Sequence, residues 1–565
     1  MGTRLIIVGG VAGGATAAAR ARRVDENAQI VLFERGGYIS FANCGLPYYI
    51  GQVIKSRNSL LMTTPEVFRD RYRIDVRLMS EVIAIDRQDK IVHVKQYPDG
   101  KTYTMGYDKI ILSPGAEPIK PPFEGIGLDK VFSLRSIPDS DRIRDFVDTV
   151  KPKSAVVVGG GFIGIEMAEN LVERGVATTI IEMQGQVMTP LDYEMASHVH
   201  AHLKARGVSL VLSDGVKSIS GQSEQLLITT KQGNTLVCDM VIMSVGITPE
   251  NKLAREAGLE LCEHGNIMVN AAMLTSDAHI YAVGDAVCIK DFMTGAHTST
   301  ALAGPANKQA RIAADNALGR RSIFKGTLGT SVVKVFDLTV AATGANEKQL
   351  KRNSISYLKS YTHSASHASY YPGAEVMSIK LLFSPSDGKI LGGQIIGKEG
   401  VDKRIDVIAT AIRSHMSVND LEELELAYAP PYSSAKDPVN IAGFVASNIL
   451  NGDMVVIHWD ELDSLDMNSH VLIDLRNRDE LEIAGRIEGA VHIPLHHLRE
   501  KIEGLDRDKI YIPFCAAGLR GYIAHRILVQ KGFKSKNLSG GFKTYLAAKE
   551  KIMDESATSS LWLSE

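Results

Sequence analysis

Short apolar runs that end in glycine-rich turns recur in the first half of the chain. Arg4–Val8 is followed by the turn 9–14, with the letters GGVAGG, and by an alanine-rich stretch over residues 15–23. A second apolar run ends at Glu34, twenty residues after Gly14. This order predicts a strand, a turn, a helix and a strand with a terminal acid, which together bind a dinucleotide. The predicted contacts are Gly9, Gly10, Ala12, Gly13, Gly14, Glu34 and Arg35. Val11 stands where this motif usually has its middle glycine.

The same pattern returns 150 residues later with a complete GxGxxG turn. An apolar run over 153–158 precedes the turn 159–164, a helix is expected over 165–174, and a strand over 177–181 ends at Glu182. An acid in that place accepts hydrogen bonds from a free ribose 2′-hydroxyl and repels a 2′-phosphate, so we expect NADH rather than NADPH. The predicted contacts are Gly159, Gly161, Phe162, Ile163, Gly164 and Glu182.

Two further apolar runs end in turns that we assign to the first nucleotide. One run ends in Ser113, Pro114 and Gly115, and the other ends in Gly284-Asp285, after which a helix is expected. Between the first fingerprint and these runs lies the stretch 40–47, SFANCGLP, which carries a single cysteine, Cys44. A helix is expected over 46–53, and a thiol at a helix N-terminus has its thiolate favoured, which lowers its pKa. Cys44 is therefore the candidate nucleophile.

Length, charge and cysteine spacing limit the classes of protein to which this chain could belong. The chain has 565 residues, too many for one core, and a net charge of −2, which gives no electrostatic case for nucleic acid or an acidic membrane surface. Its five cysteines are scattered and form no CxxC pair, so we expect neither a disulfide framework nor a metal site. No signal peptide precedes the first strand and no apolar run is long enough to span a bilayer, so a cytoplasmic location is expected.

Together, the two fingerprints, the Ser-Pro-Gly turn and the Gly-Asp turn resemble the two-dinucleotide flavoprotein disulfide reductases. The resemblance covers about the first 450 residues and implies an α/β fold with two Rossmann-type domains and an α+β dimerisation domain. It implies FAD on residues 1–150 and 271–325, with Asp285 near the ribityl–phosphate region, NADH on residues 151–270, and a homodimer formed through residues 326–450.

A single thiol separates this chain from many members of that family. Position 49, where a second cysteine would stand, is Tyr49, so Cys44 has no internal disulfide partner and must cycle as a sulfenic acid, a mixed disulfide or a persulfide. The single-cysteine branch contains coenzyme A disulfide reductases, NADH oxidases and NADH peroxidases. The basic helix after the first turn resembles the coenzyme A branch, which implies coenzyme A contacts from Arg20, Arg23, Ser40 and Asn43. A solvated basic face is the alternative.

The resemblance also implies a proton donor near the end of the dimerisation domain. Glutathione-reductase-type enzymes have a His–Glu pair there, whereas this chain reads LAYAPPYS over 426–433. Tyr428 is the expected replacement, reaching the partner's active site, and Tyr370 is expected to join it. Each tyrosine alone also suits interface packing.

Residues 451–565 form a separate unit. A strand expected over 510–514 ends at Cys515, and the loop 515–521, CAAGLRG, leads into a helix. This order resembles an α/β rhodanese, in which loop N–H groups and a helix N-terminus form an anion nest around the cysteine. Arg520 is expected to fix the loop or an anionic donor. Arg486 and Glu488 depart from the family's usual GHIPGA stretch without touching the cradle. The alternative is a structural or interaction module.

The fusion of a single-thiol reductase with a sulfur-carrying domain indicates the substrate class. We expect NADH-, FAD- and coenzyme A-dependent reduction of persulfides or polysulfides to hydrogen sulfide, with Cys44 as nucleophile and Cys515 as sulfur carrier. Coenzyme A disulfide reduction and NADH oxidase or peroxidase chemistry are alternatives. A sulfurtransferase with a regulatory flavoprotein half is the non-redox alternative.

Overall fold

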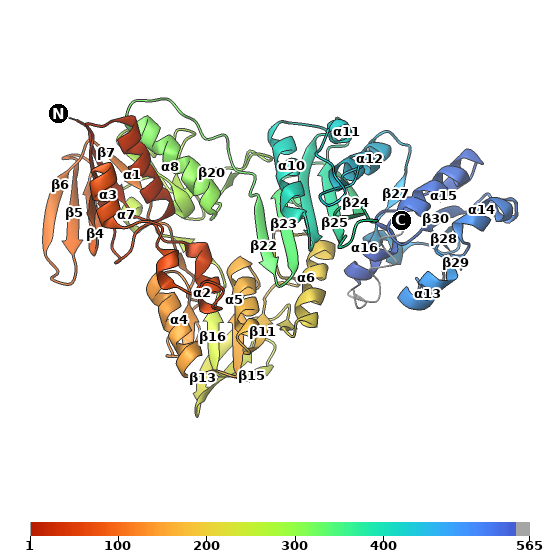
Figure 1. Cartoon of the computed structure of the whole chain (residues 1–565), viewed down its shortest axis with the longest axis horizontal. Coiled ribbons are helices and arrows are strands. Elements are labelled where there is room, and N and C mark those ends of the chain that lie inside the picture. Colours follow the sequence, from red (N-terminus) through yellow and green to blue (C-terminus); the bar gives the residue numbers. More distant parts are fainter. Residues whose placement is uncertain (1, 550–565) are drawn as a thin grey trace. The chain divides into compact units, whose positions relative to one another are not determined.

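The computed structural model describes residues 2–549, which divide into two compact units. Unit 1 runs to Gly185 and resumes over Gly207–Gly329, while unit 2 holds Gln186–Arg206 and the chain from Thr330 onward. Figure 1 labels the helices and strands and colours the chain from red at the N-terminus to blue at the C-terminus. Among the described residues, no helix combines the length and the apolar character needed to cross a membrane.

The first nucleotide-binding domain is built on a parallel five-stranded sheet in unit 1. Its strands lie in the order β19 (Ile280–Ala282), β7 (Lys109–Leu112), β1 (Arg4–Val8), β2 (Gln29–Phe33) and β3 (Asp75–Arg77). Helices α1 (Ala12–Val24) and α8 (Ala303–Ala317) pack against each other beside this sheet. Leu5, Ile6 and Ile7 are fully buried, because both faces of a parallel sheet are covered.

Smaller elements complete this domain. The helices are α2 (Leu46–Ile50), α3 (Pro65–Tyr72) and α7 (Lys252–Glu256). One antiparallel sheet contains β4 (Ser80–Asp86), β5 (Ile91–Gln96) and β6 (Thr102–Gly106), and another sheet contains β18 (Ile267–Met268), β20 (Val287–Lys290) and β21 (His297–Thr298).

The second nucleotide-binding domain repeats the parallel five-stranded sheet. Its order is β12 (Ser209–Val211), β11 (Ala177–Ile181), β10 (Ser154–Val158), β16 (Met240–Met243) and β9 (Val131–Ser133). Helices α4 (Ile137–Thr149) and α5 (Phe162–Glu173) belong to it. Two antiparallel sheets complete it, made of β13 (Val216–Gln222), β14 (Gln225–Thr230) and β15 (Thr235–Cys238), and of β8 (Ala116–Pro118) and β17 (Ile247–Pro249).

Unit 2 begins with an antiparallel sheet that carries the dimerisation domain. Its order is β22 (Ser331–Val335), β23 (Leu338–Gly344), β26 (Ile390–Gly397), β25 (Val376–Phe383) and β24 (Leu358–Ala365). The helices are α9 (Glu347–Arg352), α10 (Val401–Arg413), α11 (Val418–Glu423) and α12 (Pro438–Leu450). Helix α6 (Tyr193–Ala205) joins this unit although its sequence lies between β11 and β12 of the second nucleotide-binding domain.

The C-terminal domain is a small α/β fold. A parallel sheet has the order β29 (Val491–His492), β28 (His470–Asp474), β30 (Ile510–Phe514) and β31 (Lys534–Ser535), and β27 (Val456–Ile457) pairs with β32 (Asn537–Leu538). Its helices are α13 (Arg478–Ala484), α14 (Leu495–Lys501), α15 (Leu519–Gln530) and α16 (Gly541–Ala548). The predicted α/β fold class with two Rossmann-type domains is confirmed, and a further sheet domain and a small C-terminal α/β domain follow them in the expected order.

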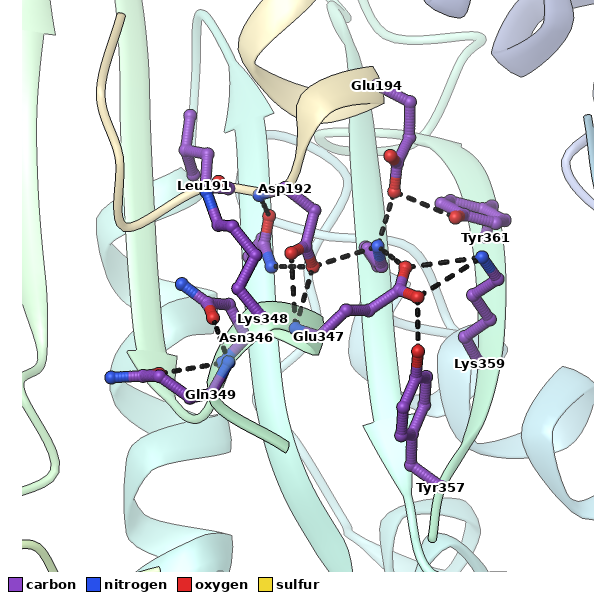
Figure 2. A network of polar contacts seen from close by, with 12 residues as sticks. Leu191, Asp192, Glu194, Asn346, Glu347, Lys348, Gln349, Tyr357, Lys359 and Tyr361 are labelled. Carbon is purple, nitrogen blue, oxygen red and sulfur yellow. Dashed lines mark hydrogen bonds and ion pairs between the residues drawn. The ribbon is translucent and has the colours of Figure 1, made fainter. Parts of the chain in front are cut away.

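A buried polar network joins the parts of unit 2 (Figure 2). The fully buried Lys380 ammonium on β25 contacts the carboxylates of Asp192, Glu194 and Glu347, with 2.9 Å to Asp192. These three carboxylates have the spacing of a metal site, but the ammonium group occupies the space between them. Lys359 links Glu347, at 3.2 Å, to Asp460 of the C-terminal domain, at 3.6 Å. The network therefore ties α6, the dimerisation sheet and the C-terminal domain together.

Two expectations about local structure are wrong. The helix expected over 46–53 is shorter, because α2 ends at Ile50. The helix expected after Asp285 is a single 3₁₀ turn, Gly284–Ala286, followed by strand β20. Val287, Cys288 and Ile289 are all buried, and a short run of that kind fits a covered strand as well as a helix.

Candidate active sites

A cavity of about 740 Å³ lies at the carboxyl ends of the first parallel sheet. Most of the predicted FAD contacts line it, namely Gly9, Ala12, Gly13, Glu34, Arg35, Ser113, Pro114, Gly115 and Asp285. Gly10 and Gly14 do not line the cavity and instead allow close packing, since a Cβ on Gly14 would lie 1.7 Å from the Gly9 carbonyl oxygen. Ligands of open α/β sheets bind at this edge, so the cavity has the expected position for a dinucleotide.

The two fingerprint acids hold their turns in the same way. Glu34 accepts hydrogen bonds from the N–H groups of Gly10 and Gly36, both at 2.8 Å. Glu182 accepts from the N–H groups of Gly160, at 2.7 Å, and Gln184, at 2.8 Å. Each carboxylate is therefore fixed at the end of its strand, facing the turn where a ribose is expected.

The residues present fit the two nucleotides. Gly161 has open space where a Cβ would stand, so the protein itself does not require glycine there and the space suits a close-approaching pyrophosphate. Val11, which stands at the equivalent position of the first turn, is half-buried and lines the first cavity. Beside the first cavity, the buried Oδ1 of Asn43 has no hydrogen-bond partner among the described residues, which leaves an acceptor for a bound group.

Asp285 lies half-buried in the wall of the same cavity. Burial raises the pKa of its carboxyl group, and the nearby Arg135 guanidinium opposes this rise. The neighbouring Gly284 N–H is fixed by Gln309, whose Oε1 accepts it at 2.8 Å. Asp285 is thus held at the cavity by the turn that the sequence indicated.

Cys44 lies in a 3₁₀ turn, Asn43–Gly45, directly before α2, and its thiol is free and exposed. The expected lowering of its pKa is wrong for the groups that this chain supplies. Burial around the sulfur raises the pKa of the thiol, and the carboxylates of Glu166 and Asp285 raise it further. Helix α2 has only five residues, so its dipole is too short to outweigh these effects.

Glu166 and Tyr48 were missed by the sequence analysis and lie beside Cys44. The Tyr48 hydroxyl donates to Glu166 Oε1 at 3.3 Å. Burial raises the pKa of Glu166 to about 7 and Glu169 adds to the rise, while the hydrogen bond from Tyr48 opposes it. Glu166 follows the second fingerprint on α5, so a polar residue on an otherwise apolar helix turn was the available signal.

The residues expected to contact coenzyme A are not all brought together. Asn43 lines the first cavity, and Ser40 precedes it in a left-handed conformation with φ of 45°. Arg20 forms an ion pair with Asp315 at 2.7 Å, and Arg23 is exposed on α1. Their neighbour Arg22 is buried and donates to backbone carbonyls, including that of Tyr72 at 2.7 Å. The basic face of α1 is therefore partly used for internal contacts.

Tyr370 and Tyr428 meet although 58 residues separate them. Their hydroxyl oxygens are 2.8 Å apart, and both rings are exposed in the single chain, Tyr370 by 74% and Tyr428 by 48%. The hydrogen bond to Tyr428 raises the pKa of the Tyr370 hydroxyl. Two exposed aromatic rings that share a hydrogen bond form a surface suited to contact with a partner subunit.

Cys515 lies at the end of β30 with its sulfur fully buried. The Gly518 N–H donates to Cys515 Sγ at 3.0 Å, and Gly518 has a φ of +126°, which turns the loop into α15. An N–H group that points at the sulfur favours its anionic form. One N–H group of the loop therefore points at the sulfur, as the predicted anion nest requires.

Arg520 fixes this loop to a neighbouring helix. Its guanidinium forms two hydrogen bonds with the Glu480 carboxylate of α13, both 2.7 Å long. The pKa of Glu480 is lowered because Arg520 and the Asn477 N–H outweigh the effect of burial. Of the two roles expected for Arg520, the geometry matches fixation of the loop. Glu480 was missed because its partner lies 40 residues away.

Comparison with known proteins gives the family of each part. The model for "Pyridine nucleotide-disulphide oxidoreductase" matches residues 3–310, its dimerisation domain matches 330–438, and the "Rhodanese-like domain" matches 458–548. The coenzyme A disulfide reductase of Staphylococcus haemolyticus is 36% identical over 447 residues, which covers 79% of this chain and 100% of that protein.

Solved structures resemble the whole chain. The reduced Bacillus anthracis CoADR-RHD is 49% identical with a TM-score of 0.95, over 98% of this chain and 99% of that one. A NAD-dependent persulfide reductase from A. fulgidus is 37% identical with a TM-score of 0.89, over 96% of this chain and 99% of that one. A water-forming NADH oxidase from Lactobacillus brevis, at 24% identity, a TM-score of 0.77, and 80% and 99% coverage, shows the fold alone.

These matches agree with the two fingerprints, the cavity and the rhodanese loop. The chain therefore belongs to the pyridine nucleotide-disulphide oxidoreductase family, as a FAD- and NADH-dependent oxidoreductase that acts on a sulfur group and carries a dimerisation domain and a rhodanese-like domain.

Proposed function

We propose that this chain reduces the sulfane sulfur of coenzyme A persulfide or polysulfide with NADH and releases hydrosulfide, and that its rhodanese domain carries sulfane sulfur. The observation that carries the proposal is the pairing of two different thiols in one chain. Cys44 is exposed beside the first cavity without a second cysteine in its motif, and Cys515 lies in an anion nest with Gly518 N–H at 3.0 Å. The names of the Bacillus and A. fulgidus relatives support the same pairing.

The chemistry assigned to Cys44 is a thiol exchange followed by a reduction. The Cys44 thiolate attacks the outer sulfur of the persulfide, the sulfur–sulfur bond to coenzyme A breaks, and coenzyme A leaves as its thiolate. Cys44 then holds a persulfide. FAD held by the residues of the first cavity would supply the two electrons of NADH, and with one proton these would reduce the persulfide to hydrosulfide and the Cys44 thiolate.

The surrounding residues have assigned tasks in this scheme. Glu34 and Asp285 hold FAD in the first cavity, and Glu182 with the turn 159–164 holds NADH. Asn43 offers a free acceptor beside Cys44 and, with Ser40, is proposed to contact coenzyme A. Arg23 and Arg20, which also pairs with Asp315, are proposed as further contacts. The Tyr370–Tyr428 pair supplies a proton to the partner's Cys44 in the proposed homodimer, since one hydroxyl can donate while the other restores its proton.

Cys515 collects sulfur from bulk donors and passes it to coenzyme A. Arg520 holds the loop that carries Cys515 through its two hydrogen bonds with Glu480. The domain limits predicted from the sequence and the cytoplasmic location remain part of this proposal.

The deciding experiment measures NADH oxidation and hydrosulfide release without oxygen, with coenzyme A persulfide as substrate. Wild type should release one hydrosulfide for each NADH, Cys44→Ser should be inactive, and Cys515→Ser should fail only when the sulfur comes from a bulk donor. NADH consumption that occurs only with oxygen or peroxide would contradict the proposal.

One alternative has support of its own. The Staphylococcus relatives are named coenzyme A disulfide reductase, and the same Cys44 site can form a mixed disulfide with one half of coenzyme A disulfide. Activity with coenzyme A disulfide that far exceeds the activity with coenzyme A persulfide would favour this alternative. An NADH oxidase or peroxidase, or a sulfurtransferase with a regulatory flavoprotein half, would show as activity that needs oxygen, peroxide or no NADH at all.

A further inference from the structure

The loop that carries Cys515 rests on the start of helix α16. The Phe542 N–H donates to the Cys515 carbonyl oxygen at 2.8 Å, and the Lys543 N–H donates to the Ala516 carbonyl oxygen at 2.9 Å. Gly541 allows this approach, because its φ is +59° and a Cβ there would lie 2.5 Å from the Cys515 carbonyl oxygen. The position of the Cys515 loop therefore depends on where α16 begins.

The start of α16 is in turn held by a histidine of the dimerisation sheet. His363 on β24 places Nε2 2.9 Å from Thr544 Oγ1 and Nδ1 2.8 Å from Ser378 Oγ. The Thr544 hydroxyl donates to the Gly540 carbonyl oxygen at 3.2 Å, so it must accept from His363 Nε2–H. Nδ1 then lacks a proton and accepts from the Ser378 hydroxyl. Burial, Lys543 and His198 lower the pKa of His363, which agrees with a neutral ring.

The contact around this histidine is close. A Cβ on Gly540 would lie 2.7 Å from the Cβ of Tyr361, and Gly540 has a φ of +71°. Tyr361 is itself fixed, because its hydroxyl donates to Glu194 at 2.8 Å (Figure 2). The ring of His458 packs edge-on against Tyr361 with centroids 5.9 Å apart. The rhodanese domain therefore contacts β24 at two nearby residues, Tyr361 and His363.

We propose that His363, which belongs to the dimerisation domain, is a positioning residue for Cys515 of the rhodanese domain. The proposal rests on the proposed role of Cys515 as a sulfur carrier. Four hydrogen bonds connect the imidazole to the loop. His363 bonds to Thr544, Thr544 bonds to Gly540, and two α16 N–H groups donate to the Cys515 and Ala516 carbonyl oxygens. Without the first bond, α16 is free to shift, and the Gly518 N–H loses its alignment with the Cys515 sulfur.

The reaction used as a probe is sulfur uptake from thiosulfate by the full-length protein. The Cys515 thiolate attacks the outer sulfur, the sulfur–sulfur bond of thiosulfate breaks, and sulfite leaves, so that Cys515 carries a persulfide. The rate is followed by the release of sulfite and by the mass of the intact protein after mixing. Reduction of coenzyme A disulfide by NADH is measured in parallel, because it does not use this loop.

Four variants separate positioning from a general structural effect. His363→Phe should slow sulfur uptake about tenfold, the effect of one lost hydrogen bond, and Thr544→Val should do the same. The double variant should be no slower than either single variant, because both remove the same bond. His363→Gln keeps an amide N–H near the position of Nε2 and should restore most of the rate. His497→Phe, on the exposed side of α14, is the control and should match wild type.

The possible results lead to different conclusions. Wild-type uptake in both His363→Phe and Thr544→Val would overturn the proposal, and so would two effects that multiply in the double variant. If His363→Phe does not fold, Thr544→Val and His363→Gln still decide the matter by the same criteria. If Cys515→Ser takes up sulfur as fast as wild type, the carrier role of Cys515 fails, which is a separate result from failure of the His363 role.

Discussion

Replacement of Lys380 by methionine is the sharpest test of how unit 2 is held together. Lys380 is fully buried on β25, and its ammonium group contacts the carboxylates of Asp192, Glu194 and Glu347 (Figure 2). Methionine has a similar length and fills the same space without the charge. The variant therefore removes the central cation and leaves three buried carboxylates close together.

The expected loss of stability follows from the burial of the pair. Removal of one partner from a buried ion pair costs about 3–5 kcal/mol, because the remaining charge is left uncompensated. Lys359 stays 3.2 Å from Glu347 and keeps part of the compensation, so we expect a loss near the middle of this range, about 4 kcal/mol.

The loss should depend on pH in a defined direction. In the wild type, burial favours protonation of Glu347, but Lys380 and Lys359 outweigh it and lower the pKa to about 2. This lowered carboxyl group stabilises the folded state above pH 4.5 and loses that effect as the pH falls towards 2. Without Lys380, burial and repulsion raise the carboxyl pKa values, so protonation relieves the strain. The difference in free energy of unfolding between variant and wild type should therefore shrink from pH 7.5 to pH 5.

Tryptophan fluorescence during urea unfolding provides the assay. The chain has two tryptophans, Trp459 and Trp562. Trp459 lies in unit 2 next to Asp460 of the network, so its signal reports on that unit. Lys389→Met, which removes an exposed ion pair with Asp387 from the same domain, is the matched control and should leave the midpoint unchanged. A loss below about 1 kcal/mol, or a loss that stays constant with pH, would refute the reasoning.

Three further predictions concern the two thiols and the buried histidines. Glu166→Gln removes a charge that raises the pKa of Cys44, so the pH profile of Cys44 alkylation should move to lower pH, whereas Glu173→Gln at the exposed end of α5 should not move it. Gly541→Ala should abolish sulfur uptake by Cys515 and spare reduction of coenzyme A disulfide, because the new Cβ would collide with the Cys515 carbonyl oxygen; normal uptake would contradict this. Burial lowers the pKa of several histidines in unit 2, so the unfolded chain takes up protons first and the urea midpoint should fall from pH 7.5 to pH 5; an equal midpoint at both values would disprove it. These histidines and their pKa values are His198 (about 3), His458 (about 3) and His525 (about 4).

The sequence predicted those parts of the fold that local patterns determine. The strands Arg4–Val8 and Ile510–Phe514 appear with the expected limits. Each is a continuous apolar run, and each ends where the expected turn or loop begins, at Gly9 and at Cys515. The glycine turns were equally clear, because a Cβ at Gly9 would lie 2.1 Å from the Ser113 carbonyl oxygen.

Features that depend on long-range contacts were not predictable. Lys380 reads as a polar residue in a strand, and nothing near it in sequence shows that Asp192 and Glu194 approach from nearly 190 residues away. The expectation that the pKa of Cys44 is lowered was wrong for the same reason. The expectation considered only the local helix, whereas the deciding carboxylates, Glu166 and Asp285, come from distant segments. Single-sequence patterns give the positions of reactive groups but not the charges that surround them.

The dimerisation sheet holds the other parts of unit 2 together. Strands β24 and β25 contact Asp192 and Glu194, from the segment that precedes and begins α6. They also contact His458, Asp460 and the α16 turn of the rhodanese domain. Tyr361 touches both sets, since its hydroxyl binds Glu194 and its ring contacts His458. Because the sheet contacts both the α6 segment and the rhodanese domain, it can keep the Cys515 loop in a fixed position without taking part in the reaction. The rhodanese domain is therefore fixed within unit 2. The residues that fix it, Tyr361 and His363, are as important for the position of Cys515 as the loop that surrounds its sulfur.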